Sequence, residues 1–203
     1  KSEAIINAAD RIIEGEFKDQ FVVDVYQAGA GTSFNMNVNE VISNIAIESL
    51  GWKKGNYSVI HPNDHVNLGQ STNDVFPATM RISALYLLKG LFPVVDALVK
   101  SFNKKANEFD KTIKSGRTHL QDAAPITLGQ EFSGYADAVS KSAKKIKKAS
   151  DALKELGIGG TAVGTGLNSH PDYKERIIKE LQKVTNLDIR GAANYFEAMQ
   201  SNA

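Results

Sequence analysis

The chain has 203 residues, of which 42% are hydrophobic and 23% charged, as in an ordinary globular protein with enough apolar residues for a sizeable core. A formal net charge of +1 gives no sign of electrostatic binding to nucleic acid or anionic lipid, so we expect neither nucleic acid nor a membrane as a partner. The absence of cysteine excludes disulfides and thiolate metal sites, and we expect a reducing, cytoplasmic location.

Apolar residues recur every three or four positions in five segments, which predicts amphipathic helices. We expect these helices over residues 2–16, 38–50, 74–109, 127–156 and 173–184. Pro93 predicts a kink or a restart within the third of them. Weak strand alternation occurs in residues 22–26 (VVDVY) and 112–120 (TIKSGRTHL).

Long helices joined by glycine-rich and polar connections predict an all-α fold, a long-helix bundle. The chain changes character near Ser71, which predicts a smaller N-terminal helical domain over residues 1–70 and the first part of the bundle over residues 71–203. By inspection we expect no apolar run long enough to span a bilayer and no signal peptide. The start at Lys1 and the abrupt end in AMQSNA predict a piece of a longer protein.

Three polar clusters lie between the expected helices, where functional loops usually lie. The first, residues 29–37 (GAGTSFNMN), combines glycines with the hydroxyls of Thr32 and Ser33 and the amide of Asn35. The second is residues 69–74 (GQSTND), before a long helix, and the third is residues 115–122 (SGRTHLQD).

These clusters supply hydroxyls, amides, a histidine and an arginine, but little acid. Neutral donors at a helix start bind an anion without like-charge repulsion, which predicts a small molecule that carries a carboxylate. A competing interpretation is that Ser71, Thr72 and Asn73 merely cap a helix.

His61 and His65 are four residues apart, as in a metal pair on a helix. Pro62 argues against a helix there, and no third ligand is evident in the sequence. We therefore expect no metal site.

Four stretches in this order resemble the aspartase and class II fumarase branch of the fumarase/aspartase superfamily. They are residues 29–40 (GAGTSFNMNVNE), 61–74 (HPNDHVNLGQSTND), 116–132 (GRTHLQDAAPITLGQEF) and 159–168 (GGTAVGTGLN). The resemblance implies a homotetramer with a central bundle, active sites built from three subunits and no cofactor. It also implies elimination of a group from a C4 dicarboxylate to give fumarate.

The resemblance assigns roles to individual residues. It implies that Thr32 contacts the substrate, that Thr118 and His119 lie at its leaving-group side, and that His119 orients or relays a proton. It implies two further sets: Ser71, Thr72 and Asn73 for the substrate carboxylate, and His61, Asn63 and Asp64 for a second dicarboxylate site known in fumarases.

Part of the family's machinery is absent from the chain. The family's base is a serine on a GSS loop, followed by a lysine and an asparagine that bind substrate, and no such pattern follows Gly166. We therefore predict that the chain ends before the catalytic loop and that it is inactive in isolation.

Small differences favour one branch. Aspartases and class II fumarases differ at the positions of Ala30, Thr72 and Leu120, and at all three positions the residue in this chain resembles aspartases. Two other stretches resemble class II fumarases slightly more, residues 35–40 (NMNVNE) and 131–136 (EFSGYA). The sequence therefore favours elimination of ammonia from L-aspartate, with interconversion of malate and fumarate as the alternative and a non-catalytic helical assembly module as a second one.

Overall fold

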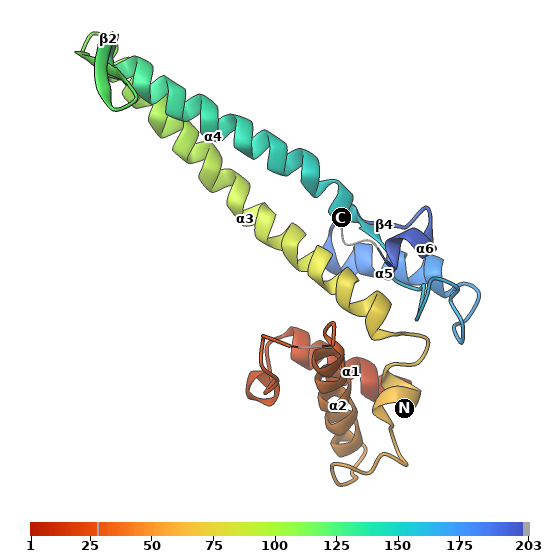
Figure 1. The fold of residues 1–203 in the computed structure, drawn as a ribbon. Coiled ribbons are helices and arrows are strands. Elements are labelled where there is room, and N and C mark those ends of the chain that lie inside the picture. The colour runs from red at the N-terminus through yellow and green to blue at the C-terminus, as the bar shows by residue number, and fades with distance from the viewer. Residues whose placement is uncertain (28, 201–203) are drawn as a thin grey trace. The chain divides into compact units, whose positions relative to one another are not determined.

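The computed structural model describes residues 1–27 and 29–200. The chain forms two compact units, Lys1–Arg81 together with Glu155–Ala203, and Ile82–Lys154. The long helix α3 (Thr72–Glu108) begins in the first unit and continues into the second (Figure 1). These compact units are not the predicted lyase domains, residues 1–70 and 71–203. That division stays a prediction.

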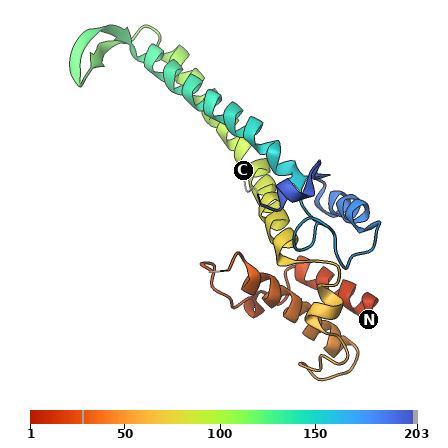
Figure 2. The same ribbon diagram turned by 45° about the vertical axis from the view of Figure 1, so that its right-hand side comes forward.

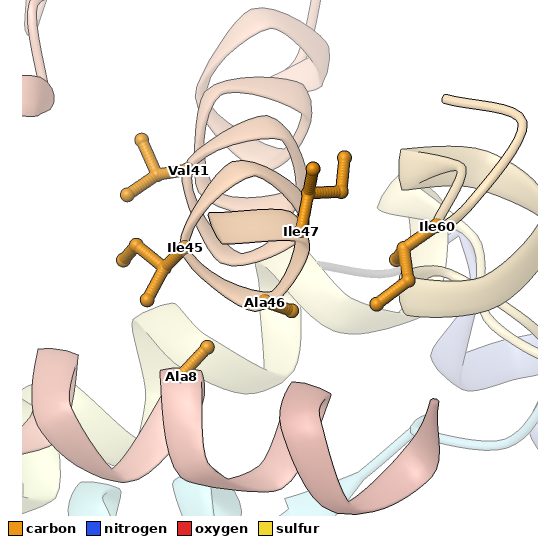
Figure 3. Close-up of a cluster of buried hydrophobic side chains, with 6 residues drawn as sticks. All are labelled: Ala8, Val41, Ile45, Ala46, Ile47 and Ile60. Carbon is orange, nitrogen blue, oxygen red and sulfur yellow. The ribbon is translucent and has the colours of Figure 1, made fainter. Parts of the chain in front are cut away.

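The N-terminal part of the first unit contains α1 (Ser2–Ile13), the short helical turn η1 (Lys18–Gln20) and α2 (Thr32–Ser49). Ala8 of α1 faces the side chains of α2 (Figure 3). The buried apolar cluster consists of Ala8, Val41, Ile45, Ala46, Ile47 and Ile60. Helix α2 begins six residues earlier than its apolar pattern predicted, because the polar residues of its first turn are helical as well.

The weak strand expected at residues 22–26 does not form; this segment is irregular. Val22 and Tyr26 are 80% and 93% exposed. Alternation alone does not stabilise a strand, which needs a hydrogen-bonded neighbour and a surface to pack on.

The remaining part of the first unit follows the second unit in sequence. Its two-residue strands β3 (Glu155–Leu156) and β4 (Arg190–Gly191) pair in parallel. Helices α5 (Tyr173–Thr185) and α6 (Tyr195–Ala198) accompany them. Leu156, Ile158, Ile178 and Ile189 are buried in this part.

The second unit is an antiparallel helix pair, in which α3 from Ile82 onward lies beside α4 (Leu128–Ser150) in both views (Figures 1 and 2). A hairpin of β1 (Ile113–Thr118) and β2 (Gln121–Thr127) joins them, and the turn η3 (Ala152–Lys154) follows α4. Aromatic rings pack between the helices: Phe102, Phe109, Phe132 and Tyr135. The predicted all-α class is confirmed, and the weak alternation at residues 112–120 marks the hairpin.

Of the two outcomes expected at Pro93, a kink or a restart, the restart is wrong, since α3 runs without interruption through this residue, and the kink stays a prediction. A proline inside a helix removes one backbone hydrogen bond. The helix lies against α4 on both sides of Pro93, because Phe92 and Val95 each line a hollow together with residues of α4.

The expectation about apolar runs is also corrected. Helix α3 contains an 18-residue window with a mean hydropathy of 1.7, long and apolar enough to cross a membrane by length and composition. Only 6% of that window is buried, and Leu87 and Val94 are 76% and 66% exposed. One such helix is weak grounds for a membrane span, because bundle helices have the same composition.

Helix α4 begins with a capping box. The Thr127 hydroxyl accepts a hydrogen bond from the backbone N–H of Gln130, and the Gln130 side chain accepts one from the N–H of Thr127, each at 3.0 Å. We expect Thr127→Ala to lower the free energy of unfolding by about 1 kcal/mol. Urea denaturation measures this, and Ser133→Ala inside the same helix is the control, expected to have a smaller effect.

Candidate active site

The first turn of α3 is held by its own side chains. The Ser71 hydroxyl accepts a hydrogen bond from the backbone N–H of Asn73 at 3.2 Å, and the Asp74 carboxylate accepts one from the N–H of Ser71 at 2.9 Å. The side chain of Ser71 therefore caps the helix, as the competing interpretation predicted. Its hydroxyl hydrogen is still available for donation, so capping and ligand binding are compatible.

The Asp74 side chain connects this turn to a loop that is distant in sequence. Its Oδ2 atom accepts hydrogen bonds from the backbone N–H groups of Gly159 and Thr161, at 3.0 and 2.9 Å. Its side chain is 1% exposed. Burial raises the pKa of the Asp74 carboxyl, and the backbone N–H donors act in the opposite direction. The carboxylate is thus committed to backbone donors inside the protein.

Asn73 is tied to the same loop, because its side-chain amide donates a hydrogen bond to the carbonyl of Ala162 at 3.0 Å. The amide nitrogen carries a second hydrogen. Asn73 is exposed, so that hydrogen is available to a ligand.

The first cluster meets the start of α3. The side-chain amide of Asn35 donates a hydrogen bond to the Thr72 hydroxyl at 2.9 Å. Asn35 is buried, so this polar group of the first cluster points into the protein and supports Thr72 from behind. Sequence spacing gave no sign of this contact between residues 37 positions apart.

Thr32 lies at the exposed beginning of α2, and its hydroxyl donates a hydrogen bond to the carbonyl of Gly29 at 2.9 Å. Gly31 precedes it with φ 83°, and a Cβ atom there would lie 2.6 Å from the Phe76 ring. Glycine is therefore required at position 31 for both backbone conformation and space. Through these contacts the structure brings the Thr32 loop and the start of α3 together.

The residues expected at a second dicarboxylate site form a short helical turn, η2 (Pro62–Val66). His61 caps it, since its Nδ1 atom accepts hydrogen bonds from the backbone N–H groups of Asn63 and Asp64. The argument from Pro62 against a helix is wrong, because proline is tolerated in the first turn, where its missing N–H needs no partner.

A hollow of about 390 Å³ adjoins this turn. Asn63 and Asp64 line it, together with Asn67, Gly69, Gln70 and Asn168. A larger hollow of about 650 Å³ is lined by residues such as Asn37, Glu40 and Lys54, and none of the predicted site residues lines it.

The two histidines of this turn do not form a metal pair. The Nδ1 atom of His65 accepts a hydrogen bond from the backbone N–H of His61 at 2.9 Å, and that of His61 is occupied by the cap. In the part of the chain that the structure describes, no three histidine or acidic side chains form a group that could hold a metal ion.

Thr118 and His119 belong to the second unit, where they lie exposed at the tip of the hairpin. Thr118 pairs with Gln121, so His119 and Leu120 form a two-residue turn, with φ of 47° and 62°. Such turns favour asparagine and glycine, and other side chains are strained there. Leu120 is 92% exposed, so burial does not offset this strain within the chain.

The comparisons with known proteins identify the family of the chain. The family model described as lyase matches residues 1–203. The chain is 50% identical to aspartate ammonia-lyase of Bacillus subtilis (strain 168) over 199 residues, 98% of the chain and 42% of that protein. It is 49% identical to class II fumarate hydratase of Halobacterium salinarum over 203 residues, 100% of the chain and 43% of that protein.

A solved structure gives the same answer. A fumarate lyase:delta crystallin from Brucella melitensis, bound to cobalt, matches with a TM-score of 0.91 and 45% identity over 97% of this chain and 43% of that chain. The chain therefore belongs to the lyase family, in the fumarase/aspartase superfamily. It spans less than half the length of these relatives.

Proposed function

We propose that the complete protein carrying this chain is an aspartate ammonia-lyase, which eliminates ammonia from L-aspartate to give fumarate. The observation that carries the proposal is the first turn of α3. There Ser71, Thr72 and Asn73 present neutral donors at a helix N-terminus, and the neighbouring Asp74 carboxylate is buried and committed to backbone N–H groups. A substrate carboxylate binds there without meeting a like charge at the surface.

The chemistry follows from this placement. The proton on C3 of L-aspartate becomes acidic when the adjacent carboxylate accepts charge. A base removes that proton, the C2–C3 double bond forms, and the C2–N bond breaks with its electron pair leaving on ammonia. Donors aimed at the carboxylate stabilise the developing charge, by roughly 2 to 4 kcal/mol for each donor by analogy with oxyanion holes.

The remaining roles follow the family resemblance. We propose that Thr32 contacts the substrate and that Thr118 and His119 act at the leaving-group side, with His119 orienting or relaying a proton. The base is a serine outside this chain. The complete protein is proposed to be a homotetramer, in which exposed apolar residues of α3, such as Leu87 and Val94, are covered by other helices.

The alternative is a class II fumarase, supported by relatives of that name at similar identity. Ala30 and Thr72 are the residues that resemble aspartases, and they favour the ammonia-lyase because both belong to elements that meet at the start of α3, beside the proposed site. Ala30 lies directly before Gly31, which packs against Phe76 of α3, and Thr72 belongs to the first turn of α3 itself.

Fumarate formation tests the proposal. The complete protein is offered L-aspartate and L-malate in parallel, and fumarate is followed by ultraviolet absorbance. We expect fumarate from aspartate and none from malate, and we expect the 203-residue chain alone to be inactive. Fumarate from malate alone would mean a hydratase. Turnover of neither substrate would favour a non-catalytic helical assembly module.

A further inference from the structure

Four side chains behind the proposed substrate site are joined by hydrogen bonds: Asn67, Asn39, Asn35 and Thr72. A contact of Asn67 with the backbone determines which groups donate and which accept. The backbone carbonyl of Gln70 can only accept, and the side-chain amide of Asn67 donates to it at 3.4 Å. This contact orients the Asn67 side chain, so that its Oδ1 atom faces α2.

The Oδ1 atom of Asn67 is also an acceptor, and two amide groups of α2 donate to it. They are Asn39 Nδ2 at 3.2 Å and Asn35 Nδ2 at 3.4 Å. The orientation of the Asn35 amide is thereby fixed, with its NH2 group towards Asn67 and Thr72. Its two hydrogens have two acceptors, because Thr72 Oγ1 lies 2.9 Å from the same nitrogen.

The Thr72 hydroxyl therefore accepts on the side of Asn35, and its own hydrogen points away from it. Among the residues that the structure describes, Thr72 donates no hydrogen bond from this hydroxyl. Asn35 is 7% exposed and Thr72 half-buried, so the accepting side faces the interior and the donating side faces the proposed substrate.

We propose that Asn35 is a positioning residue, which holds the Thr72 hydroxyl as a hydrogen donor towards the substrate carboxylate. The inference rests on the proposed lyase function and adds to it a residue that does not touch substrate. A hydroxyl without this support rotates and presents either its hydrogen or a lone pair. Fixing the donor in advance removes that reorganisation when charge develops on the carboxylate.

The substitution Asn35→Asp tests this directly, because it keeps the shape of the side chain and replaces a donor by an acceptor. The Thr72 hydroxyl then turns its hydrogen inward. In the complete protein we expect kcat/KM for fumarate formation to fall at least about tenfold, as for a lost hydrogen bond to a charged group. Asn44→Asp is the control on the same helix; its side chain contacts Glu40 and Gly55, away from Thr72.

A double-mutant cycle separates positioning from a general structural effect. In a Thr72→Val background the hydroxyl is gone, so we expect Asn35→Asp to change kcat/KM by less than about twofold. An equal fall in both backgrounds would overturn the proposal, because it would show that the substitution acts without the Thr72 hydroxyl, through the fold or through the added negative charge. A fall for Asn44→Asp as large as for Asn35→Asp would also overturn it.

Succinate, a C4 dicarboxylate that cannot undergo the elimination, distinguishes this inference from the proposed function. Suppose that the wild-type protein makes no fumarate but binds succinate in calorimetry. Binding that weakens at least about tenfold in Asn35→Asp, and only when Thr72 is present, then supports the positioning role although the reaction is wrong. If the wild-type protein neither makes fumarate nor binds succinate, both proposals fall.

Discussion

Replacing Asp74 by asparagine is expected to lower the free energy of unfolding by about 2 to 3 kcal/mol. The two carboxylate oxygens accept three backbone N–H groups, from Ser71, Gly159 and Thr161. An asparagine side chain has the same shape but one acceptor oxygen, and its NH2 group would face a backbone donor. At least one buried N–H then loses its partner.

Two measurements check the effect of Asp74→Asn. Urea denaturation gives the change in the free energy of unfolding. Hydrogen exchange reports the amides of Ser71, Gly159 and Thr161 directly, and we expect at least one of the three to lose protection. Asp137→Asn is the control for charge, because Asp137 lies in an exposed ion pair with Lys141 and should have little effect. Unchanged protection at all three amides would contradict the role assigned to Asp74.

The second large effect is expected at Gly129, where α4 begins beside the end of α3. An added Cβ atom would lie 2.7 Å from Asp110 Cα and 2.8 Å from Asp110 N, and it would also contact the carbonyl of Ala106. These are backbone atoms, so the contact cannot be relieved by a change of rotamer. We expect Gly129→Ala to destabilise the helix pair by about 2 to 3 kcal/mol, measured by urea denaturation.

The same helix provides a matched control with the opposite sign. Gly134 is also helical, and nothing lies within 4 Å of a Cβ atom added there. Gly134→Ala should therefore stabilise the protein by up to about 1 kcal/mol, because alanine loses less backbone entropy in a helix. If both substitutions stabilise, the close approach at Gly129 is not present in solution.

The helices were largely predictable because each carries a periodic apolar stripe. The stripe of α4 that includes Phe132 and Tyr135 packs against Phe102 of α3. Errors arose where local rules compete with context. Pro93 was expected to give a kink or a restart, yet α3 continues through it. Residues 22–26 read as a strand, yet they have no neighbouring strand.

Predictability of the site was lower, because its contacts join residues distant in sequence. The donors at the start of α3 were predicted from residue type and position. The role of Asp74 was missed, although Ser71 and Asp74 have the spacing of a capping box. Its bonds to Gly159 and Thr161 span more than 80 residues, and no local pattern predicts them. The amide of Asn35 was noticed as part of the first polar cluster, but its contact with Thr72 was not predicted.

The three predicted carboxylate-binding residues differ in how freely evolution can vary them. The Ser71 side chain also caps α3, and that of Asn73 also holds the loop at Ala162, so a substitution at either position alters stability together with binding. The Thr72 side chain takes no part in the cap, and serine would retain its hydroxyl while removing a methyl group. Of the three positions, 72 therefore tolerates an exchange that keeps its hydroxyl at the smallest cost to the fold, because the acceptor for the buried Asn35 amide is retained.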